Sequence, residues 1–179
     1  MSDAEGPTVA PATVGDVDDV TDLWIALAEG QRRHGSTLLA EPNRTAVREW
    51  VARSVVTGEL LVARDGEADD DGGPVGFVGF SLDREGYERD RVRGTVSNLF
   101  VVPERRGEGI GADLLDAAER ALAAAGAEAV ALEALADNDR ARAFYADRGY
   151  DRHRVELTKP LSESADGDPT EGDAGTGTE

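Results

Sequence analysis

The feature that most constrains how this chain folds is a glycine-rich turn between two apolar segments, within residues 96–126. The first segment is a β-branched and aromatic run that stops at Pro103, because proline has no N–H to give to a sheet and its ring fixes φ. The second has the apolar spacing of an amphipathic helix that ends at Gly126: Ile110, Leu114, Leu115, Ala118 and Leu122. The stretch predicts a strand, a turn and a helix that packs on a sheet.

The turn, residues 105–111, reads Arg-Arg-Gly-Glu-Gly-Ile-Gly. Glycine has no Cβ, so a ligand can approach the backbone closely, and the free N–H groups of a helix's first turn attract an anion. These residues predict a site for a phosphate or pyrophosphate. The alternative is a solvated loop whose glycines only allow a strand to reverse into a helix.

Two other phosphate-binding patterns fit the turn poorly. A P-loop ends in Gly-Lys followed by Ser or Thr, whereas here the third glycine precedes Ala112 and no lysine is near. A dinucleotide site has some support, because Glu133 ends the next predicted strand, where a carboxylate can bind a ribose hydroxyl. The glycines of that site should open directly off the strand, however, and here they run G-x-G-x-G after several intervening residues.

The turn resembles the acyl-CoA-binding motif of the GNAT family of N-acetyltransferases, Gln/Arg-x-x-Gly-x-Gly/Ala, with Arg106, Gly109 and Gly111 at its defining positions. A second element follows at the proper distance. Residues 138–150 are similar to that family's N-x-x-A-x-x-F-Y-x-x-x-G-F/Y helix. Two motifs in register are a stronger signal than one, and together they cover residues 96–150.

The resemblance implies acetyl-CoA as co-substrate, with no metal. It also implies which residues of this chain contact each part of acetyl-CoA. The pantetheine arm would lie along the central strand against the backbone of Leu99, Phe100 and Val101, where an N–H meets the thioester carbonyl. Asn138 would contact this arm, and its alternative role is a helix N-cap. The pyrophosphate would have Arg106 as its ionic partner and would rest on the N–H groups of the following residues: Gly107, Glu108, Gly109, Ile110, Gly111 and Ala112.

Two residues are candidates for the chemistry. Tyr145 lies two helical turns after Asn138 and resembles the family's proton donor to the leaving thiolate, a transfer between groups with pKa values of about 10 and about 8.5. The alternative for Tyr145 is an aromatic residue packed beside Phe144. Glu133 matches the general base of family members that acetylate protein N-termini, and a carboxylate on an apolar strand end costs desolvation unless it has a use. The alternative for Glu133 is an exposed strand end.

The charge of the chain is unusual. It has 37 acidic and 19 basic residues, a net charge of −18, and Lys159 is its only lysine. Such a surface resembles that of proteins from salt-loving (halophilic) organisms, since at about 1 M salt a Debye length of about 3 Å screens the self-repulsion. The alternative is an acidic protein that binds basic partners, and nucleic acid is a poor partner for so negative a surface. Several arginines could give an anionic cofactor a local positive field: Arg84, Arg89, Arg91, Arg93 and Arg105. For the first four, the alternative is a string of solvated arginines on an edge strand.

The chain has no cysteine, and therefore no disulfide and no thiol nucleophile, which fits an intracellular protein. Residues 1–7 lack the basic and apolar regions of a secretory signal, and no apolar run reaches the roughly 18 residues of a membrane span. We expect a cytoplasmic protein without a membrane partner. His34 and His153 belong to no catalytic constellation in the sequence.

The rest of the chain completes an α/β fold. Besides the central strand, the expected strands are residues 8–13, 59–64, 74–82, 128–135 and 153–158. The expected helices are residues 16–33, 45–58, 110–126 and 138–148, with Trp24 and Trp50 in the core. This order predicts a GNAT-like mixed central sheet of about six strands, with antiparallel N-terminal strands and a parallel crossover, flanked by about four helices.

One domain, residues 8–161, is expected between a flexible N-terminus, residues 1–7, and a disordered acidic tail. The tail, residues 162–179, has no large apolar residue and cannot bury enough surface to offset the cost of ordering. The family often has a seventh strand, but few residues separate Tyr150 from Pro160. The last hairpin is therefore either missing or replaced by a partner chain, which would make a homodimer.

These features predict an acetyl-CoA-dependent N-acetyltransferase that works by direct transfer in a ternary complex. The acceptor would be a primary amine on a small molecule, a protein N-terminus or a lysine, bound near the first two helices and residues 34–40. The alternative is a non-catalytic acyl-CoA-binding or sensing module on the same fold.

Overall fold

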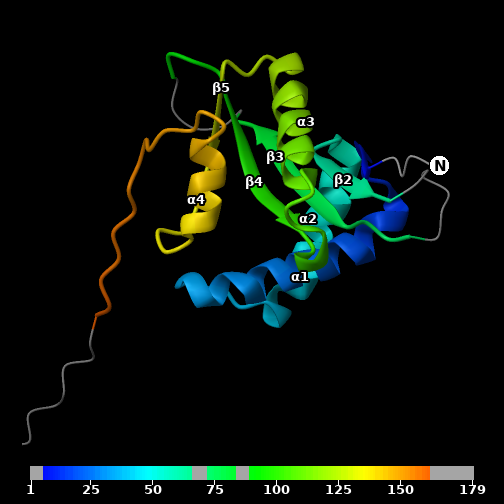
Figure 1. Cartoon of the computed structure of the whole chain (residues 1–179), viewed down its shortest axis with the longest axis horizontal. Coiled ribbons are helices and arrows are strands. Elements are labelled where there is room, and N and C mark those ends of the chain that lie inside the picture. Colours follow the sequence, from blue (N-terminus) through cyan, green and yellow to red (C-terminus); the bar gives the residue numbers. More distant parts are fainter. Residues whose placement is uncertain (1–5, 66–71, 84–88, 162–179) are drawn as a thin grey trace, which may run out of the picture.

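The computed structural model describes residues 6–65, 72–83 and 89–161 (Figure 1). The strands are β1 (Thr8–Pro11), β2 (Leu60–Arg64), β3 (Gly76–Leu82), β4 (Arg93–Val101) and β5 (Ala129–Leu132). The helices are α1 (Val17–Gln31), α2 (Arg44–Thr57), α3 (Ile110–Ala124) and α4 (Asp139–Ala146). The predicted order is confirmed from β1 to α4.

The sheet has the strand order β1-β2-β3-β4-β5. The strands from β1 to β4 pair antiparallel, and β5 pairs parallel with β4. Parallel neighbours cannot be joined by a tight hairpin, so the chain crosses over through α3. The predicted mixed sheet with its parallel crossover is confirmed.

Helices cover both faces of the sheet, with α1 and α2 on one face and α3 on the other (Figure 1). Successive side chains of a strand point to opposite faces, and in β3 Phe77 packs with α1 and α2 while Val78 packs with α3. Trp24 of α1 is buried in the first core, as predicted. Trp50 of α2 is only half-buried and lies over Gly79 of β3, where a Cβ would come within 2.8 Å of the Trp50 ring.

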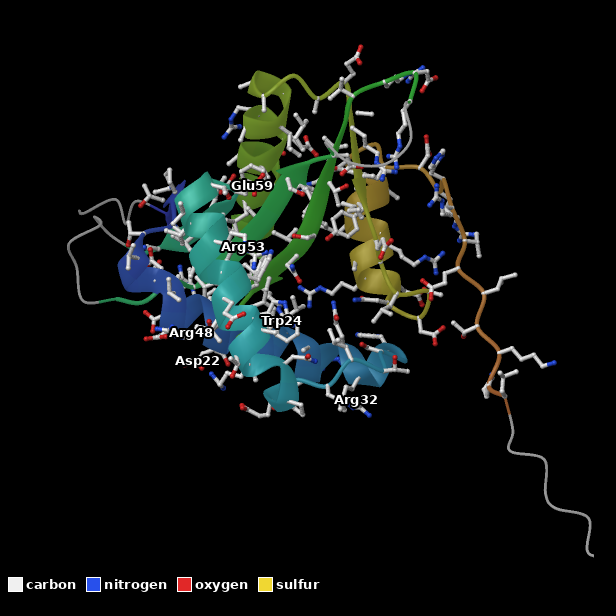
Figure 2. The ribbon with its side chains drawn as sticks, turned by 180° about the vertical axis from the view of Figure 1, so that it is seen from behind. Asp22, Trp24, Arg32, Arg48, Arg53 and Glu59 are labelled. Atoms are coloured by element: carbon white, nitrogen blue, oxygen red, sulfur yellow. The ribbon has the colours of Figure 1, made fainter. Side chains whose placement is uncertain are left out.

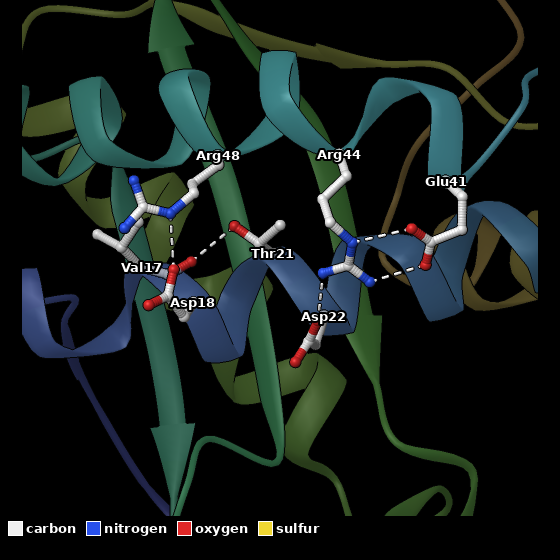
Figure 3. A network of polar contacts seen from close by, with 7 residues as sticks. All are labelled: Val17, Asp18, Thr21, Asp22, Glu41, Arg44 and Arg48. Carbon is white, nitrogen blue, oxygen red and sulfur yellow. Dashed lines mark hydrogen bonds and ion pairs between the residues drawn. The ribbon is translucent and has the colours of Figure 1, made fainter.

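Ion pairs between α1 and α2 line the solvent side of this helix pair (Figure 3). Arg44 of α2 binds Asp22 of α1 and also Glu41, and Arg48 of α2 binds Asp18 of α1 at 2.7 Å. Exposed pairs of this kind contribute little to stability, on the order of 0–1 kcal/mol each. The buried side chains between the helices therefore provide most of the packing energy.

The last predicted strand is absent from the structure. Residues 151–161 form no strand and run away from the domain (Figure 1). Val155 and Leu157 of this segment are 71% and 89% exposed. A strand needs a partner, and the edge of β5 is only 4 residues long while the segment brings no hairpin partner of its own. The described chain has a sheet of five strands instead of about six.

Some expectations fall outside the described residues, among them the tail 162–179, most of the N-terminus and Arg84. In the described part of the chain, no helix has the length and apolar character needed to cross a membrane.

Candidate active site

Strands β4 and β5 separate beyond the middle of β4. Their pairing extends only from Arg93 with Ala129 to Val96 with Leu132. At the next residue the β3–β4 register slips, so that Ser97 is an extra residue in β4, and its hydroxyl donates to the carbonyl of Gly79 at 3.1 Å. Such a bulge bends a strand and increases its twist. Among the described strands, none therefore pairs with the remainder of β4 on its β5 side.

The open edge of β4 presents backbone donors and acceptors. The Val102 N–H donates toward β3, to the Val75 carbonyl at 2.9 Å. Because the direction of backbone groups alternates along a strand, the N–H groups of Leu99 and Val101 point away from β3. The Val101 carbonyl lies on this open side as well and accepts a hydrogen bond from Arg106 Nε at 2.9 Å. An extended ligand carrying amide groups can pair with such an edge.

The glycine turn follows β4 and leads into α3. Gly107 and Gly109 have φ of +89° and +90°, in the left-handed region that favours glycine, and Gly109 is the N-cap of α3. Within the described chain, no N–H of residues 107–111 donates to a protein acceptor. Ala112 differs, because its N–H donates to the Gly109 carbonyl at 2.8 Å. The free groups form a row at the positive end of the α3 dipole, an arrangement that binds anions.

The Arg106 side chain turns back from this row of N–H groups. Besides its bond to Val101, its guanidinium lies 5.4 Å from the centre of the Phe100 ring. Phe100 packs with the α1–α2 core, whereas Val101 packs with the α3 core. Burial lowers the pKa of Arg106, and the positive charges of Arg140 and Arg33 lower this pKa further. Its predicted contact with the pyrophosphate stays a prediction.

The second motif begins at α4, which packs on the start of α3. A Cβ built on Gly111 would lie 3.8 Å from the Phe144 ring. Asn138 caps α4, since its Oδ1 accepts the Ala141 N–H at 3.1 Å. The alternative role of Asn138 as an N-cap is therefore present, and its contact with a cofactor remains a prediction.

Tyr145 of α4 is half-buried among aromatic rings. Its ring makes edge contacts with Phe144 at 5.2 Å and with Tyr150 at 5.7 Å. Burial raises the pKa of Tyr145, and among the described residues its hydroxyl has no hydrogen-bond partner. By contrast, the Tyr150 hydroxyl donates to Glu119 Oε1 at 2.6 Å and fixes the end of α4 to α3. The packing role of Tyr145 is real, and its hydroxyl is still free for a ligand.

Glu133 directly follows β5 and is exposed. Nothing in the described chain pairs with its carboxylate. The sequence analysis argued that a carboxylate on an apolar strand end costs desolvation unless it has a function. This argument does not apply in the structure, because the Glu133 carboxylate is exposed to water. Its place after the diverging end of β5 is compatible with the predicted role as a base, and that role remains a prediction.

Most of the arginines expected to provide a positive field are neutralised by carboxylates. Arg89 and Arg93 both bind Asp83, with Arg93 Nε at 2.6 Å. Arg105 binds Asp65 and Glu108, and these contacts raise its pKa.

The positive charges that, after burial, lower the pKa of Arg106 belong to arginines from other parts of the chain, Arg140 and Arg33. Sequence reasoning singled out neither of them. The sequence analysis assigned no role to His34. In the structure, His34 Nδ1 lies 3.1 Å from the Asp137 carbonyl, and this contact joins the turn after α1 to the loop before α4.

Comparisons with known proteins agree with this geometry. The model of the "Acetyltransferase (GNAT) family" matches residues 24–150, which include both motifs and the diverging strands. The chain belongs to the GNAT family of acetyltransferases. An uncharacterized N-acetyltransferase of Archaeoglobus fulgidus is 39% identical to this GNAT protein over 138 residues, covering 74% of this chain and 85% of the relative.

Solved structures share the GNAT fold at lower identity. A GCN5-related N-acetyltransferase from Ralstonia eutropha JMP134 matches with a TM-score of 0.67 and 23% identity, over 87% of this chain and 99% of that chain. The NatC complex bound to Gag peptide and CoA matches with a TM-score of 0.65 and 18% identity, over 83% of this chain and 87% of that chain. These two likenesses show the fold, and the family match makes the protein an acetyltransferase.

Proposed function

We propose that this GNAT protein transfers an acetyl group from acetyl-CoA to a primary amine, directly and within a ternary complex. The observation that carries the proposal is the continuity of the free N–H groups of residues 107–111 with the open edge of β4. The first element suits the diphosphate of coenzyme A, and the second suits its extended, amide-bearing arm. The left-handed glycines Gly107 and Gly109 leave open space, since a Cβ on either would meet nothing within 4 Å.

The reaction forms an N–C bond and breaks a C–S bond, and acetyl-CoA supplies the thioester. The backbone N–H groups of Leu99 and Val101 face the open edge of β4, where one of them can donate to the thioester carbonyl. A donor already in place stabilises the oxygen as negative charge develops on it. The carboxamide of Asn138 has a fixed orientation because its Oδ1 accepts the Ala141 N–H in the first turn of α4, and it is the proposed contact of the pantetheine arm.

Tyr145 is the proposed proton donor to the departing thiolate. Burial raises the pKa of Tyr145 and keeps the phenol protonated across the physiological range. The ordinary pKa is about 10 for a phenol and about 8.5 for a thiol, so proton transfer from the phenol to the thiolate costs roughly 2 kcal/mol of free energy. Burial of Tyr145 increases this cost. We therefore assign Tyr145 a modest share of the rate, in the lower part of the range of acid catalysis.

Glu133 is the proposed base that removes a proton from the ammonium form of the acceptor. Since its carboxylate is exposed, water can reach it, and we propose that it acts on the amine through a water molecule. A carboxylate beside the acceptor also favours the approach of a cationic amine.

The acceptor remains a class rather than a compound. The solved NatC complex holds a peptide and CoA together on the same fold, which supports a peptide N-terminus beside small-molecule amines and lysines as an acceptor. We place the protein in the cytoplasm of a salt-loving organism, on the net charge of −18 and the single lysine.

A screen for thiol release tests the proposed function. Acetyl-CoA and a panel of amines are incubated with the protein in about 1 M salt, and acetylated amine is measured beside free thiol. Equal amounts of both products, formed only when amine is present, support direct transfer. A burst of thiol equal to the amount of enzyme, formed without amine and leaving acetyl on the protein, would indicate an acyl-enzyme instead. Acetyl-CoA binding without release for any amine would favour the sensing module.

A further inference from the structure

We infer that Arg106 is a positioning residue, which aligns the two halves of the cofactor site through the hydrogen bond from its Nε to the Val101 carbonyl. One half is the row of free N–H groups of residues 107–111, and the other is the open edge of β4. The inference rests on the proposed acetyl transfer from acetyl-CoA. It gives Arg106 a role different from the ionic contact with the pyrophosphate that the family resemblance implies.

The bond from Arg106 closes the turn between β4 and the glycines. Val101 is the last residue of β4, and Arg106 directly precedes Gly107, the first glycine of the turn with positive φ. The two backbone bonds of the intervening turn, at 3.1 and 3.4 Å, begin and end within residues 102–106. The side chain of Arg106 therefore ties the start of the N–H row to the end of the strand.

Arg106 also contacts an aromatic ring that is fixed in the core. Its guanidinium carbon lies 5.4 Å from the centre of the Phe100 ring. Phe100 is buried in the α1–α2 core, where its ring centre lies 6.4 Å from that of Phe77. A guanidinium can lie over an aromatic ring while its N–H groups donate hydrogen bonds. Two consecutive residues of β4 therefore hold the Arg106 side chain.

The bond also changes what the open edge of β4 presents to an anion. Val101 is the residue of this edge closest to the glycine turn, and a carbonyl oxygen without a donor there would repel a bound diphosphate. Arg106 donates to this oxygen, while the Val101 N–H still faces the open side. At the end nearest the turn, the described edge therefore offers the cofactor a donor instead of an unpaired acceptor.

The same contacts make Arg106 a poor free cation for the diphosphate. Its side chain is half-buried. Turning the guanidinium toward a phosphate would give up both the bond to Val101 and the contact with Phe100, so a new ionic contact would first have to replace them. The free N–H groups and the α3 dipole already attract the diphosphate. The hydrogen bond of Arg106 should therefore matter more to acetyl-CoA binding than its charge.

Three substitutions at Arg106 separate the hydrogen bond from the charge. In Arg106→Gln, the side-chain amide nitrogen stands as many bonds from the backbone as Nε of arginine, so the donor is kept and the charge is lost. In Arg106→Met, a methyl group takes that position, and both are lost. Arg106→Lys keeps the charge but has a methylene group in place of the donor. The same substitutions at Arg53, an exposed residue of α2, are the matched controls for net charge (Figure 2).

Calorimetry measures the affinity of each variant for acetyl-CoA. The salt concentration is the lowest at which melting curves show folded protein, so that screening does not hide an ionic contact. Arg106→Gln should bind within about three-fold of the wild type, because it keeps the donor and loses only the contact with Phe100. Arg106→Met and Arg106→Lys should bind about ten-fold more weakly, the effect of one lost hydrogen bond. The Arg53 variants should bind like the wild type.

A different order of affinities would overturn the positioning role. If Arg106→Gln bound as weakly as Arg106→Met, the donor would not be what matters, and wild-type affinity of Arg106→Lys would then make Arg106 the ionic partner of the diphosphate. Wild-type affinity of Arg106→Met would overturn the role as well. A wild type that binds no acetyl-CoA would end the proposed function and this role together, whereas tight binding with the wrong order of variants would remove the role alone.

A measurement on the wild type does not depend on how the variants fold. NMR of protein labelled with ¹⁵N-arginine follows the exchange of the Arg106 Nε–H with water, and nuclear Overhauser contacts report the distance to the Phe100 ring. We expect slower exchange for Arg106 than for Arg53 in the free protein, and contacts with Phe100 that persist when acetyl-CoA is bound. Equally fast exchange for both arginines, or loss of the Phe100 contacts on binding, would overturn the positioning role.

Discussion

Arg106 Nε donates to the carbonyl oxygen of Val101 at 2.9 Å, so the first residue of the glycine motif is fixed to the last residue of β4. This hydrogen bond occupies one acceptor on the open edge and turns the guanidinium toward the Phe100 face. Beyond Arg106, the backbone of the glycine loop continues to α3, and the Arg106 side chain does not follow it. The motif therefore contributes a row of free N–H groups and a cation whose position is fixed by Val101 and Phe100.

Substituting Gly109 should weaken acetyl-CoA binding. With φ of +90°, Gly109→Val strains the backbone by about 1–3 kcal/mol and places methyl groups beside the free N–H row. We expect a lower melting temperature and at least a ten-fold loss of affinity, measured by calorimetry on protein shown to be folded. Gly126→Val is the matched control, because Gly126 has φ of +98° at the far end of α3 and should lose stability without losing affinity. If both variants bound acetyl-CoA equally well, the diphosphate would not lie at this loop.

Tyr145→Phe should lower kcat by about ten- to a thousand-fold, because it removes only the proposed acid. Its stability should change little, since the described structure gives that hydroxyl no partner to lose. Tyr150→Phe is the matched control: it loses the bond to Glu119 and should be about 1 kcal/mol less stable, with kcat within a few-fold of wild type. Normal turnover in Tyr145→Phe would reduce Tyr145 to a packing residue.

Glu133→Gln should lower turnover most at low pH, where the acceptor amine is protonated and must lose its proton on the enzyme. The defect should shrink as pH approaches the pKa of the free amine. General-base assistance contributes about a hundred- to ten-thousand-fold, and an exposed carboxylate acting through water belongs at the lower end. A pH–rate profile that matches wild type throughout would transfer the role to solvent or to another group.

The buried pair of Asp16 and Arg64 predicts how stability depends on pH. Burial alone would raise the pKa of Asp16, but hydrogen bonds from Arg64 and Thr13 outweigh burial and hold this pKa below its ordinary value. A carboxylate with a lowered pKa stabilises the folded state above the unfolded value, and this contribution is lost as pH falls through the folded value. The free energy of unfolding should fall below about pH 4 in the wild type.

Asp16→Asn should be less stable at neutral pH by about 3 kcal/mol, because it leaves Arg64 without its partner. The acid-induced loss should be correspondingly smaller in this variant. Denaturant unfolding at several pH values measures both effects. Parallel stability curves for wild type and variant would contradict this account of Asp16.

Local patterns predicted the parts of the fold that local physics determines. The helix of residues 110–124 follows from its apolar period, and the turn before it follows from glycines that the backbone requires at positive φ. The predicted strand at residues 153–158 is wrong. A strand needs a neighbouring strand to pair with, and the alternation of apolar and polar residues within the segment cannot show whether that neighbour exists. The exposure of Glu133 depends likewise on how far β5 extends, and the structure ends β5 at Leu132.

Charge partners were the least predictable part of the site. Arg105 is close to the motif in sequence, yet it binds Asp65, which comes from the end of β2. Arg33 and Arg140 lie far from Arg106 in sequence, yet burial and then their positive charges lower its pKa, and the contact of His34 with the Asp137 carbonyl links the segments that carry them. Tertiary structure decides which arginines bind carboxylates, so closeness in sequence could not show that Arg89, Arg93 and Arg105 are paired.

The most direct test of the central claim is an NMR titration of the ¹⁵N-labelled protein with acetyl-CoA, followed by amide hydrogen exchange. The account predicts that amide resonances of residues 107–111, Leu99 and Val101 shift and that their exchange slows, because the diphosphate and the arm of the cofactor accept hydrogen bonds from them. Gly109→Val should lose these shifts, and Gly126→Val should keep them. Shifts concentrated elsewhere, for example around Val9, Asp113 and Arg120, where β1 and α3 line a separate hollow, would contradict the placement of the site.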